Sequence, residues 1–213
     1  MRLGEAWWAL LCFFAVCSAT AHAGILLSTP SAAGELPIRT WKQQRDASIV
    51  KQEFDYSCGA ASLATVLQFF YGAKIGEEDL LTAMGKEEAA SFADMARVLP
   101  HFGFKAVGVA MSVEQLSQLK IPVLLHLRFR GQEHFSVLRG IGNGAVWLAD
   151  PSWGNRRLAI GRFREMWESE ENGRAQGKAL LILPQSHRQP LPGFFGRPGD
   201  LFLPRELLPL RTF

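Results

Sequence analysis

Cysteine is nearly missing from this chain, and its scarcity excludes a scaffold that disulfides hold together. Three cysteines occur in 213 residues, and two of them, Cys12 and Cys17, lie in an apolar stretch near the N-terminus. If that stretch is removed, Cys58 has no partner in the chain and cannot form an internal disulfide. An unpaired thiol in an exported protein is either a small buried hydrophobic side chain or a reactive group. The count alone leaves both readings open.

Runs of basic residues and motifs of ATP use are also absent. The net charge is only +3, and basic residues do not alternate with aromatic ones as they do on many nucleic-acid surfaces. The chain contains no GxxxxGK[ST] phosphate-binding loop and no series of long apolar segments that would form a membrane bundle. We therefore expect no nucleic-acid partner and no ATP bound by this chain.

The first 23 residues resemble a secretory signal peptide. Arg2 precedes an apolar run at residues 7–19, and Ala21-His22-Ala23 has the small residues of a cleavage site. The run is too short for a comfortable membrane span, and an uncleaved anchor is the alternative. We expect cleavage before Gly24 and a soluble protein in the periplasm or another exported compartment.

Composition and periodicity predict four segments. These are a signal, a leader, one folded domain and a tail, at residues 1–23, 24–43, 44–183 and 184–213. Six of the eleven prolines lie in the tail, so we expect no regular element there. The tail either packs over the domain as an extended arm or docks a partner through apolar residues such as Phe194 and Phe195.

The domain begins with helical patterns and ends with alternating ones, which is typical of an α+β fold. Apolar residues recur at helical spacing over residues 58–71, and shorter helices are predicted at 76–84, after Ser91 and after Ser112, which forms a capping box with Gln115. Alternation of period two then predicts an antiparallel sheet. Its strands are expected at residues 104–110, 121–130, 134–141, 145–150, 156–160 and 178–183.

Cys58 is predicted to open the longest of these helices, which favours a reactive thiol. The partial positive charge at a helix N-terminus stabilises a thiolate, and Gly59 would let a substrate backbone approach. Gln52 precedes the cysteine and could join the Cys58 N–H in an oxyanion hole. Without Cys58, the same glutamine would be read as a solvated loop residue.

His134 is the candidate base because it opens a strand directly after a turn, where functional residues often lie. Three other histidines compete with it outside the signal. His101 could cap a helix, His126 could be a hydrogen-bonded core residue, and His187 lies in the tail.

Hairpin geometry predicts a partner for His134. If the turn centres on Asn143, residue 136 pairs with residue 150, and His134 and Asp150 share one face at the same end of the sheet. Asp150 can then accept a hydrogen bond from one imidazole nitrogen while the other faces the thiol. The alternative for Asp150 is an ordinary turn before Pro151.

The segments around these residues resemble the bacteriocin-processing, double-glycine leader cysteine peptidases. The similar stretches are the nucleophile segment, a central strand, the histidine strand and the aspartate turn, at residues 52–63, 121–126, 134–138 and 150–154. The resemblance covers residues 44–183 and implies a papain-like fold, cleavage of peptides after small residues, and neither cofactor nor metal. It also implies roles for Gln52, Cys58, His134 and Asp150, with Ser57 standing where many members have aspartate.

A signal followed by a stand-alone domain resembles the peptidase-like component of Fap-type functional-amyloid secretion systems. That resemblance implies a peptide or protein substrate and a secretion-system component as partner. We expect a cysteine peptidase that cleaves an exported polypeptide at a small-residue site. Two alternatives stay open: a non-catalytic module of the same fold that only binds its substrate, and a cell-wall amidase, which also uses cysteine and histidine.

Overall fold

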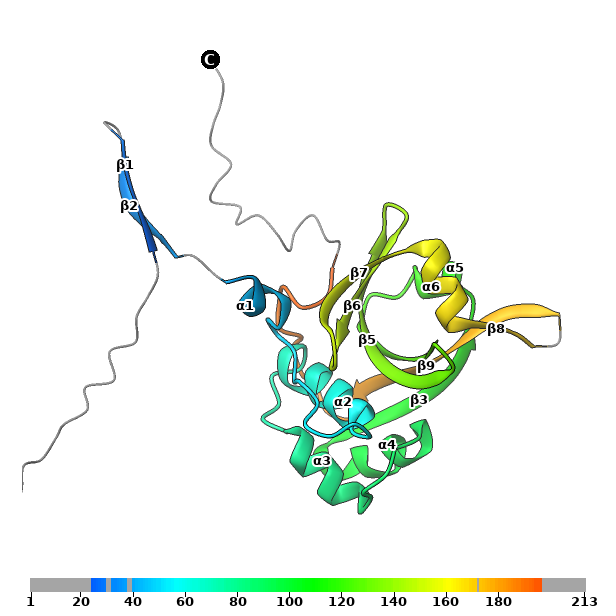
Figure 1. Cartoon of the computed structure of the whole chain (residues 1–213). Helices are drawn as coiled ribbons and strands as arrows, with labels where there is room; N and C mark the ends of the chain where they lie inside the picture. Colours follow the sequence, from blue (N-terminus) through cyan, green and yellow to red (C-terminus); the bar gives the residue numbers. More distant parts are fainter. Residues whose placement is uncertain (1–23, 30–31, 38–39, 172, 197–213) are drawn as a thin grey trace, which may run out of the picture. The chain divides into compact units, whose positions relative to one another are not determined.

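The structure divides into two units at Thr40. The computed structural model describes residues 24–29, 32–37, 40–171 and 173–196. The first unit contains an antiparallel hairpin of β1 (Gly24–Thr29) and β2 (Ala32–Pro37), drawn in blue in Figure 1. The sequence predicts only a leader segment there, so the hairpin is a feature that the pattern did not reveal. The predicted signal peptide lies outside the described residues.

Helices lead the second unit, and α2 (Cys58–Phe69) is the longest of those described. It begins at Cys58, as predicted, and ends shortly before Gly72, whose positive φ of 67° stops the helical run. The predicted cap at Ser91 and the predicted capping box at Ser112 are present, because each hydroxyl accepts from the backbone N–H three residues later. The other helices are α1 (Trp41–Arg45), α3 (Glu77–Met84), α4 (Phe92–Val98), the 3-10 helix η1 (Leu99–Phe102), α5 (Val113–Leu116) and α6 (Ile160–Trp167).

The strands of the second unit form one antiparallel sheet. Its order is β3-β9-β4-β5-β6-β7, and β8 also pairs with β9. The strands are β3 (Phe104–Met111), β4 (Val123–Phe129), β5 (Gln132–Gly142), β6 (Ala145–Asp150), β7 (Gly154–Ala159), β8 (Glu168–Glu171) and β9 (Arg174–Pro184). Each of these strands except β8 is predicted from the sequence, and the acidic sequence of β8 lacks an alternating apolar pattern.

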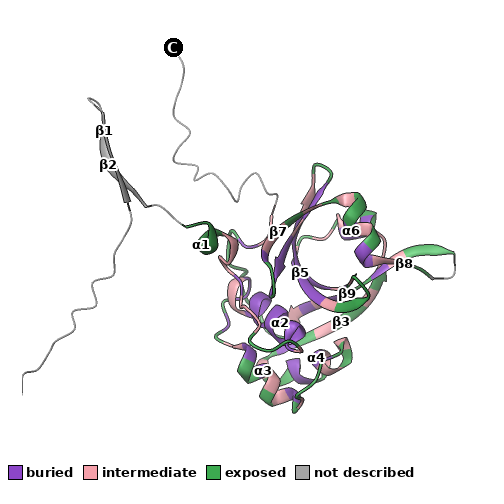
Figure 2. Cartoon of the chain, viewed as in Figure 1, coloured by how far each residue is buried: buried purple, intermediate pink, exposed green. Residues whose placement is uncertain are grey.

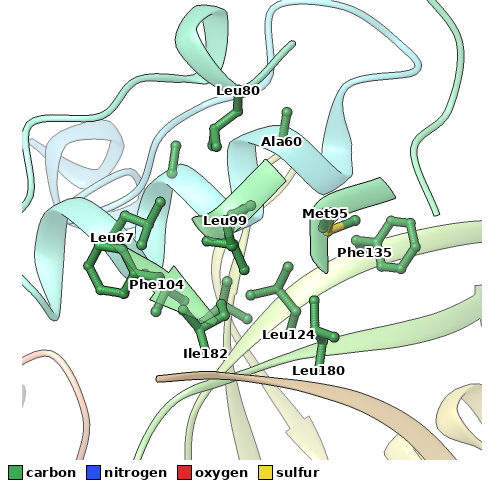
Figure 3. Packing of buried hydrophobic residues seen from close by; sticks show 14 of the residues in the cluster. Ala60, Leu67, Leu80, Met95, Leu99, Phe104, Leu124, Phe135, Leu180 and Ile182 are labelled. Atoms are coloured by element: carbon green, nitrogen blue, oxygen red, sulfur yellow. The ribbon is translucent and has the colours of Figure 1, made fainter. Parts of the chain in front are cut away.

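Two apolar clusters lie on opposite faces of this curved sheet. The first packs α2, α3 and α4 onto the sheet, and Leu67, Phe104, Leu124 and Ile182 meet at its centre (Figure 3). The second cluster includes residues of α6 and the other sheet face. Figure 2 accordingly shows α2 and the central strands as the buried part of the unit. Burial of both faces explains why the β4 sequence is apolar almost without interruption.

The chain after β9 packs back onto the domain. We call residues 185–196 the strap; they are drawn in orange to red in Figure 1. The Leu191 N–H donates to the Phe70 carbonyl at 2.7 Å, and Phe194 is only 2% exposed within the first apolar cluster. The extended-arm reading therefore holds for the strap, and the idea that Phe194 is an exposed docking residue is wrong. The rest of the predicted tail lies outside the described residues.

None of the described helices is both long and apolar enough to cross a membrane.

Candidate active site

Cys58 is held at the first position of α2 by the loop that precedes it. The Ser57 hydroxyl donates to the Phe54 carbonyl at 2.8 Å and accepts from the Phe54 N–H at 3.1 Å. This pair of bonds closes a tight turn directly before the helix. The Cys58 side chain is nearly buried, at 7% exposure. Cys58 thus belongs to the first turn of the helix, whose N–H groups have no acceptor within the helix and favour a nearby anion.

Gly59 serves the core instead of opening a path for substrate. A Cβ built on Gly59 would lie 2.4 Å from Met95 Cε and 3.3 Å from Phe135 Cδ2. Both neighbours belong to the apolar cluster between α2 and the sheet. The expectation that Gly59 lets a substrate backbone approach is therefore wrong. The glycine lets α2 pack closely on Met95 and on strand β5.

His134 and Asp150 meet at the end of the sheet. His134 Nε2 lies 3.1 Å from Asp150 Oδ2 and 3.2 Å from Oδ1, and the Asp150 side chain is almost completely buried. The backbone N–H groups of Ser152 and Trp153 donate to Asp150 Oδ1 at 3.0 and 2.9 Å. Asp150 is therefore both a turn residue, as the alternative reading had it, and the partner of His134.

The charges at this site stabilise each other. Burial lowers the pKa of His134, but hydrogen bonds with Asp150 and Cys58 and the charges of both raise it more, to about 9. Burial raises the pKa of Asp150, yet the hydrogen bond and charge of His134 outweigh it and hold that pKa below its usual value. With Nε2 occupied by Asp150, Nδ1 is the ring nitrogen available to the Cys58 thiol. The site can therefore hold a proton between a thiol and a carboxylate-oriented imidazole.

Gln52 lies against the aspartate turn. Its backbone N–H donates to the Pro151 carbonyl at 3.2 Å, and its side-chain Oε1 accepts from the Ser152 hydroxyl. Its Nε2 donates to the Phe54 carbonyl at 2.9 Å. An amide nitrogen carries two hydrogens, so one donor of Gln52 is left for another acceptor. Its role at an oxyanion stays a prediction.

Comparison with known proteins identifies the family. Residues 46–171 match the Peptidase C39 family, which is more than half of the chain. The chain belongs to this family. It is 34% identical over 161 residues to the probable functional amyloid protease FapD of Pseudomonas aeruginosa, covering 70% of this chain and 71% of that protein. Its identity to the same-named protein of Pseudomonas fluorescens is 32% over 164 residues, covering 67% and 73%.

Solved structures agree with this assignment at the level of the fold. The peptidase domain of Streptococcus ComA, a bifunctional ABC transporter, aligns with a TM-score of 0.55 at 21% identity, over 64% of this chain and 98% of that domain. A double-glycine motif protease from an AMS/PCAT transporter, solved with a leader peptide, aligns with a TM-score of 0.53 at 24% identity, over 64% of this chain and 90% of that protease. The predicted α+β, papain-like fold is confirmed, and the protein is a cysteine-type peptidase.

The competing histidines of this C39 peptidase lie elsewhere. His126 pairs with Phe135 on the neighbouring strand, so alternation points its side chain to the face opposite that of His134. Its ring contacts Phe92 and Phe135, and its Nε2 lies 3.5 Å from Glu133 Oε2. His101 and His187 are both exposed, in η1 and in the strap. His134 is therefore the histidine that the fold brings to Asp150.

The part that Ser152 plays in this peptidase was not predicted from the sequence. Ser152 bonds both Asp150 and Gln52, and the Lys51 ammonium donates to its carbonyl at 2.6 Å. A signal was available in Asp150-Pro151-Ser152, because an aspartate in a turn often accepts from the N–H two residues later. What the pattern does not reveal is that the turn also contacts the segment before Cys58.

Within the part of the chain that the structure describes, no group of three or more His, Cys, Asp or Glu side chains is arranged to hold a metal ion.

Proposed function

We propose that this C39 peptidase hydrolyses its substrate through a triad of Cys58, His134 and Asp150. One observation carries the proposal: Nε2 of the His134 ring lies within hydrogen-bond distance of both Asp150 carboxylate oxygens, and the nearby Cys58 thiol helps to raise the pKa of the same ring. Asp150 fixes the orientation of the His134 ring. The ring can then act as the base for Cys58, as a nucleophile–base pair requires.

The reaction would proceed in two steps. Cys58 Sγ attacks the scissile carbonyl carbon, and the C–N bond breaks as His134 gives its proton to the leaving amine. Water then attacks the acyl-enzyme, His134 takes a proton from it, and the C–S bond breaks to release the carboxyl product. The Cys58 backbone N–H and the Gln52 side-chain amide would stabilise the oxyanion in both steps.

The substrate in this proposal is an exported polypeptide that is cleaved at a small-residue site. The support comes from the relatives: one is a double-glycine motif protease solved with a leader peptide, and others are probable functional amyloid proteases. The signal-like residues 1–23 support a location in the periplasm or another exported compartment. A secretion-system component is the partner that fits this location.

A peptide-cleavage assay tests the proposal. The protein beginning at Gly24 is incubated with fluorogenic peptides that carry Gly-Gly, Gly-Ala or Leu-Phe at the cleavage site. We expect turnover of the first two peptides, loss of all turnover in Cys58→Ala, and covalent labelling of Cys58 by iodoacetamide at neutral pH. Equal cleavage of the Leu-Phe peptide would contradict the small-residue specificity.

A binding measurement separates the peptidase from a module that only grips its substrate. The Cys58→Ala variant should bind the Gly-Gly peptide with an affinity close to that of the unmodified protein, because the thiol is needed to break the peptide bond and not to bind the peptide. If the unmodified protein binds the peptide without cleaving it, and Cys58 resists alkylation at neutral pH, the catalytic proposal fails and the binding module is correct. Release of stem peptides with new free amino groups from peptidoglycan instead would favour the amidase.

A further inference from the structure

Strand β5 contains one residue more than its partner requires. Near the hairpin turn, Gly142 pairs with Ala145 and Gly140 with Trp147. Farther from the turn along the same two strands, Val137 pairs with Ala149. The register shifts between Leu138 and Gly140, so Arg139 is the extra residue of a β-bulge. A bulge leaves one residue unpaired and bends its strand.

The bulge decides which way the catalytic half of β5 faces. Leu138 and Ile141 are three residues apart, which would put them on opposite faces of a regular strand. Both pack into the same apolar cluster, because the bulge lies between them. His134 alternates in phase with Leu138. In a strand without the extra residue, either His134 or Ile141 would point to the other face, and Asp150 would stand opposite Val137.

The Arg139 side chain is buried and is held by neutral oxygens. Its Nε donates to the Phe194 carbonyl at 3.0 Å, its Nη1 to Asn155 Oδ1 at 2.6 Å, and its Nη2 to the Gly193 carbonyl at 3.4 Å. The guanidinium also lies 4.7 Å from the centre of the Phe194 ring. Burial lowers the pKa of Arg139 to about 10. Burying a charge is costly, so these contacts must offset the free energy that the Arg139 guanidinium loses on leaving water.

The strap also bonds the backbone of the bulge. The Gly196 N–H donates to the Arg139 carbonyl at 3.1 Å. The same approach leaves no room at the next residue, because a Cβ built on Gly140 would lie 2.1 Å from the Gly196 carbonyl oxygen. Side chain and backbone of Arg139 are thus both bound by residues 193–196, which lie far along the chain from β5.

A second connection runs from Arg139 to the segment before the nucleophile. Asn155, which accepts from Arg139, donates through Nδ2 to the carbonyls of Arg45 at 3.0 Å and Ala47 at 2.9 Å. Asn155 also pairs with Ala149, the neighbour of Asp150. Arg139 therefore joins the strap, β7 and the chain that leads to Gln52.

We propose that Arg139, clamped by strap residues 193–196, is a positioning residue for the catalytic pair. It stabilises the bulge that brings His134 and Asp150 to one face of the sheet. The proposal rests on the proposed function, since it assigns a role toward that same pair. Arg139 itself touches neither Cys58 nor His134 in any contact of the described residues.

Two variants test this role without altering the triad. Arg139→Met keeps the length of the side chain and removes the donors. Gly140→Ala leaves Arg139 intact and drives the Gly196 carbonyl away with a methyl group. Their matched controls are Arg157→Met, at an exposed arginine of β7, and Gly142→Ala, where a Cβ meets no atom within 4 Å. NMR titration of the His134 ring and steady-state peptide cleavage are measured for all four.

We expect Arg139→Met and Gly140→Ala to lower the titration midpoint of His134 from about 9 toward 6.5, because the ring loses Asp150. We also expect kcat to fall by about 10-fold to 100-fold with KM little changed, since a misplacement of about 1 Å has that effect. Both controls should behave like the unmodified protein, and Arg139→Lys should recover part of the loss.

The outcomes separate this role from a merely structural one. If Arg139→Met fails to fold, Gly140→Ala decides. A folded variant whose His134 midpoint is unchanged overturns the proposal, even when its melting temperature falls. If the unmodified protein cleaves no peptide but the His134 midpoint still moves in the variants, the positioning role stands and the proposed peptidase mechanism fails.

Discussion

The hydroxyl of Ser152 donates a hydrogen bond to the side-chain oxygen of Gln52. This contact joins the turn that begins at Asp150 to the loop that leads to Cys58. Because Oε1 is held by Ser152, the Gln52 amide nitrogen must point the other way, toward the Phe54 carbonyl and the loop before the nucleophile. One serine thus orients the residue that we propose as oxyanion donor.

Loss of the Ser152 hydroxyl, which orients Gln52, should slow catalysis less than loss of the Gln52 amide itself. We expect Gln52→Ala to lower kcat on the order of 10²-fold, as for one oxyanion donor, and Ser152→Ala to lower it by only a few-fold, about 1 kcal/mol. Ser186→Ala, at an exposed serine of the strap, is the control. Steady-state kinetics on the Gly-Gly peptide give the comparison. A larger loss in Ser152→Ala than in Gln52→Ala would contradict the assignment of the donor.

The triad should respond to substitution as one unit. Cys58→Ala and His134→Ala should each abolish turnover, because the nucleophile and the base act in the same step. Asp150→Asn keeps an acceptor for the N–H groups of Ser152 and Trp153 but loses the charge that stabilises imidazolium. It should fold and retain measurable activity, reduced on the order of 10²-fold or more.

His126 provides the control for this series. His126→Ala should keep most of the activity, since its side chain lies on the opposite face from His134. Loss of turnover in His126→Ala together with normal turnover in His134→Ala would show that the base is His126.

The stability of the fold should depend on pH through His134. The pKa of this group is raised from 6.5 to about 9 in the folded protein. A raised pKa means that the folded state binds the proton more tightly, so its stabilisation is complete below pH 6.5 and is lost as pH rises through about 9. Urea unfolding should give a free energy of unfolding that is lower at about pH 10 than at about pH 6 by about 3 kcal/mol, since each pKa unit corresponds to about 1.4 kcal/mol.

A variant isolates this contribution. His134→Gln should lose less stability over the same range, because the titrating group is gone, while His187→Gln in the exposed strap should follow the unmodified protein. If the free energy of unfolding falls with pH as much in His134→Gln as in the unmodified protein, the pH dependence belongs to other groups.

Packing at Gly59 should limit what can replace it. In Gly59→Ala the new methyl group would meet the Met95 side chain at 2.4 Å, and we expect overpacking to cost about 1–3 kcal/mol of unfolding free energy. Gly161→Ala in α6 is the control, because a Cβ there meets nothing within 4 Å, and alanine favours a helix by about 0.5–1 kcal/mol. Thermal unfolding measures the stability of both variants. A melting temperature of Gly59→Ala equal to that of the unmodified protein would contradict the tight contact with Met95.

Local pattern alone determined most of the elements and the residues of the candidate site. The apolar spacing after Cys58 predicted α2, and Ser91 and Ser112 predicted the caps of two further helices. Asn143 and Gly144 predicted the hairpin turn, and both have the positive φ that such a turn needs. These features depend on neighbours in sequence, so the sequence carries them directly.

The register that joins His134 to Asp150 came from the tertiary structure. A turn centred on Asn143, as the sequence predicts, places residue 136 beside residue 150. The turn in fact pairs Gly142 with Ala145, which by itself would put Asp150 opposite Val137. The bulge at Arg139 restores the expected pairing. It depends on a buried guanidinium and on carbonyls of the strap, and no local pattern specifies contacts between residues so far apart in the chain.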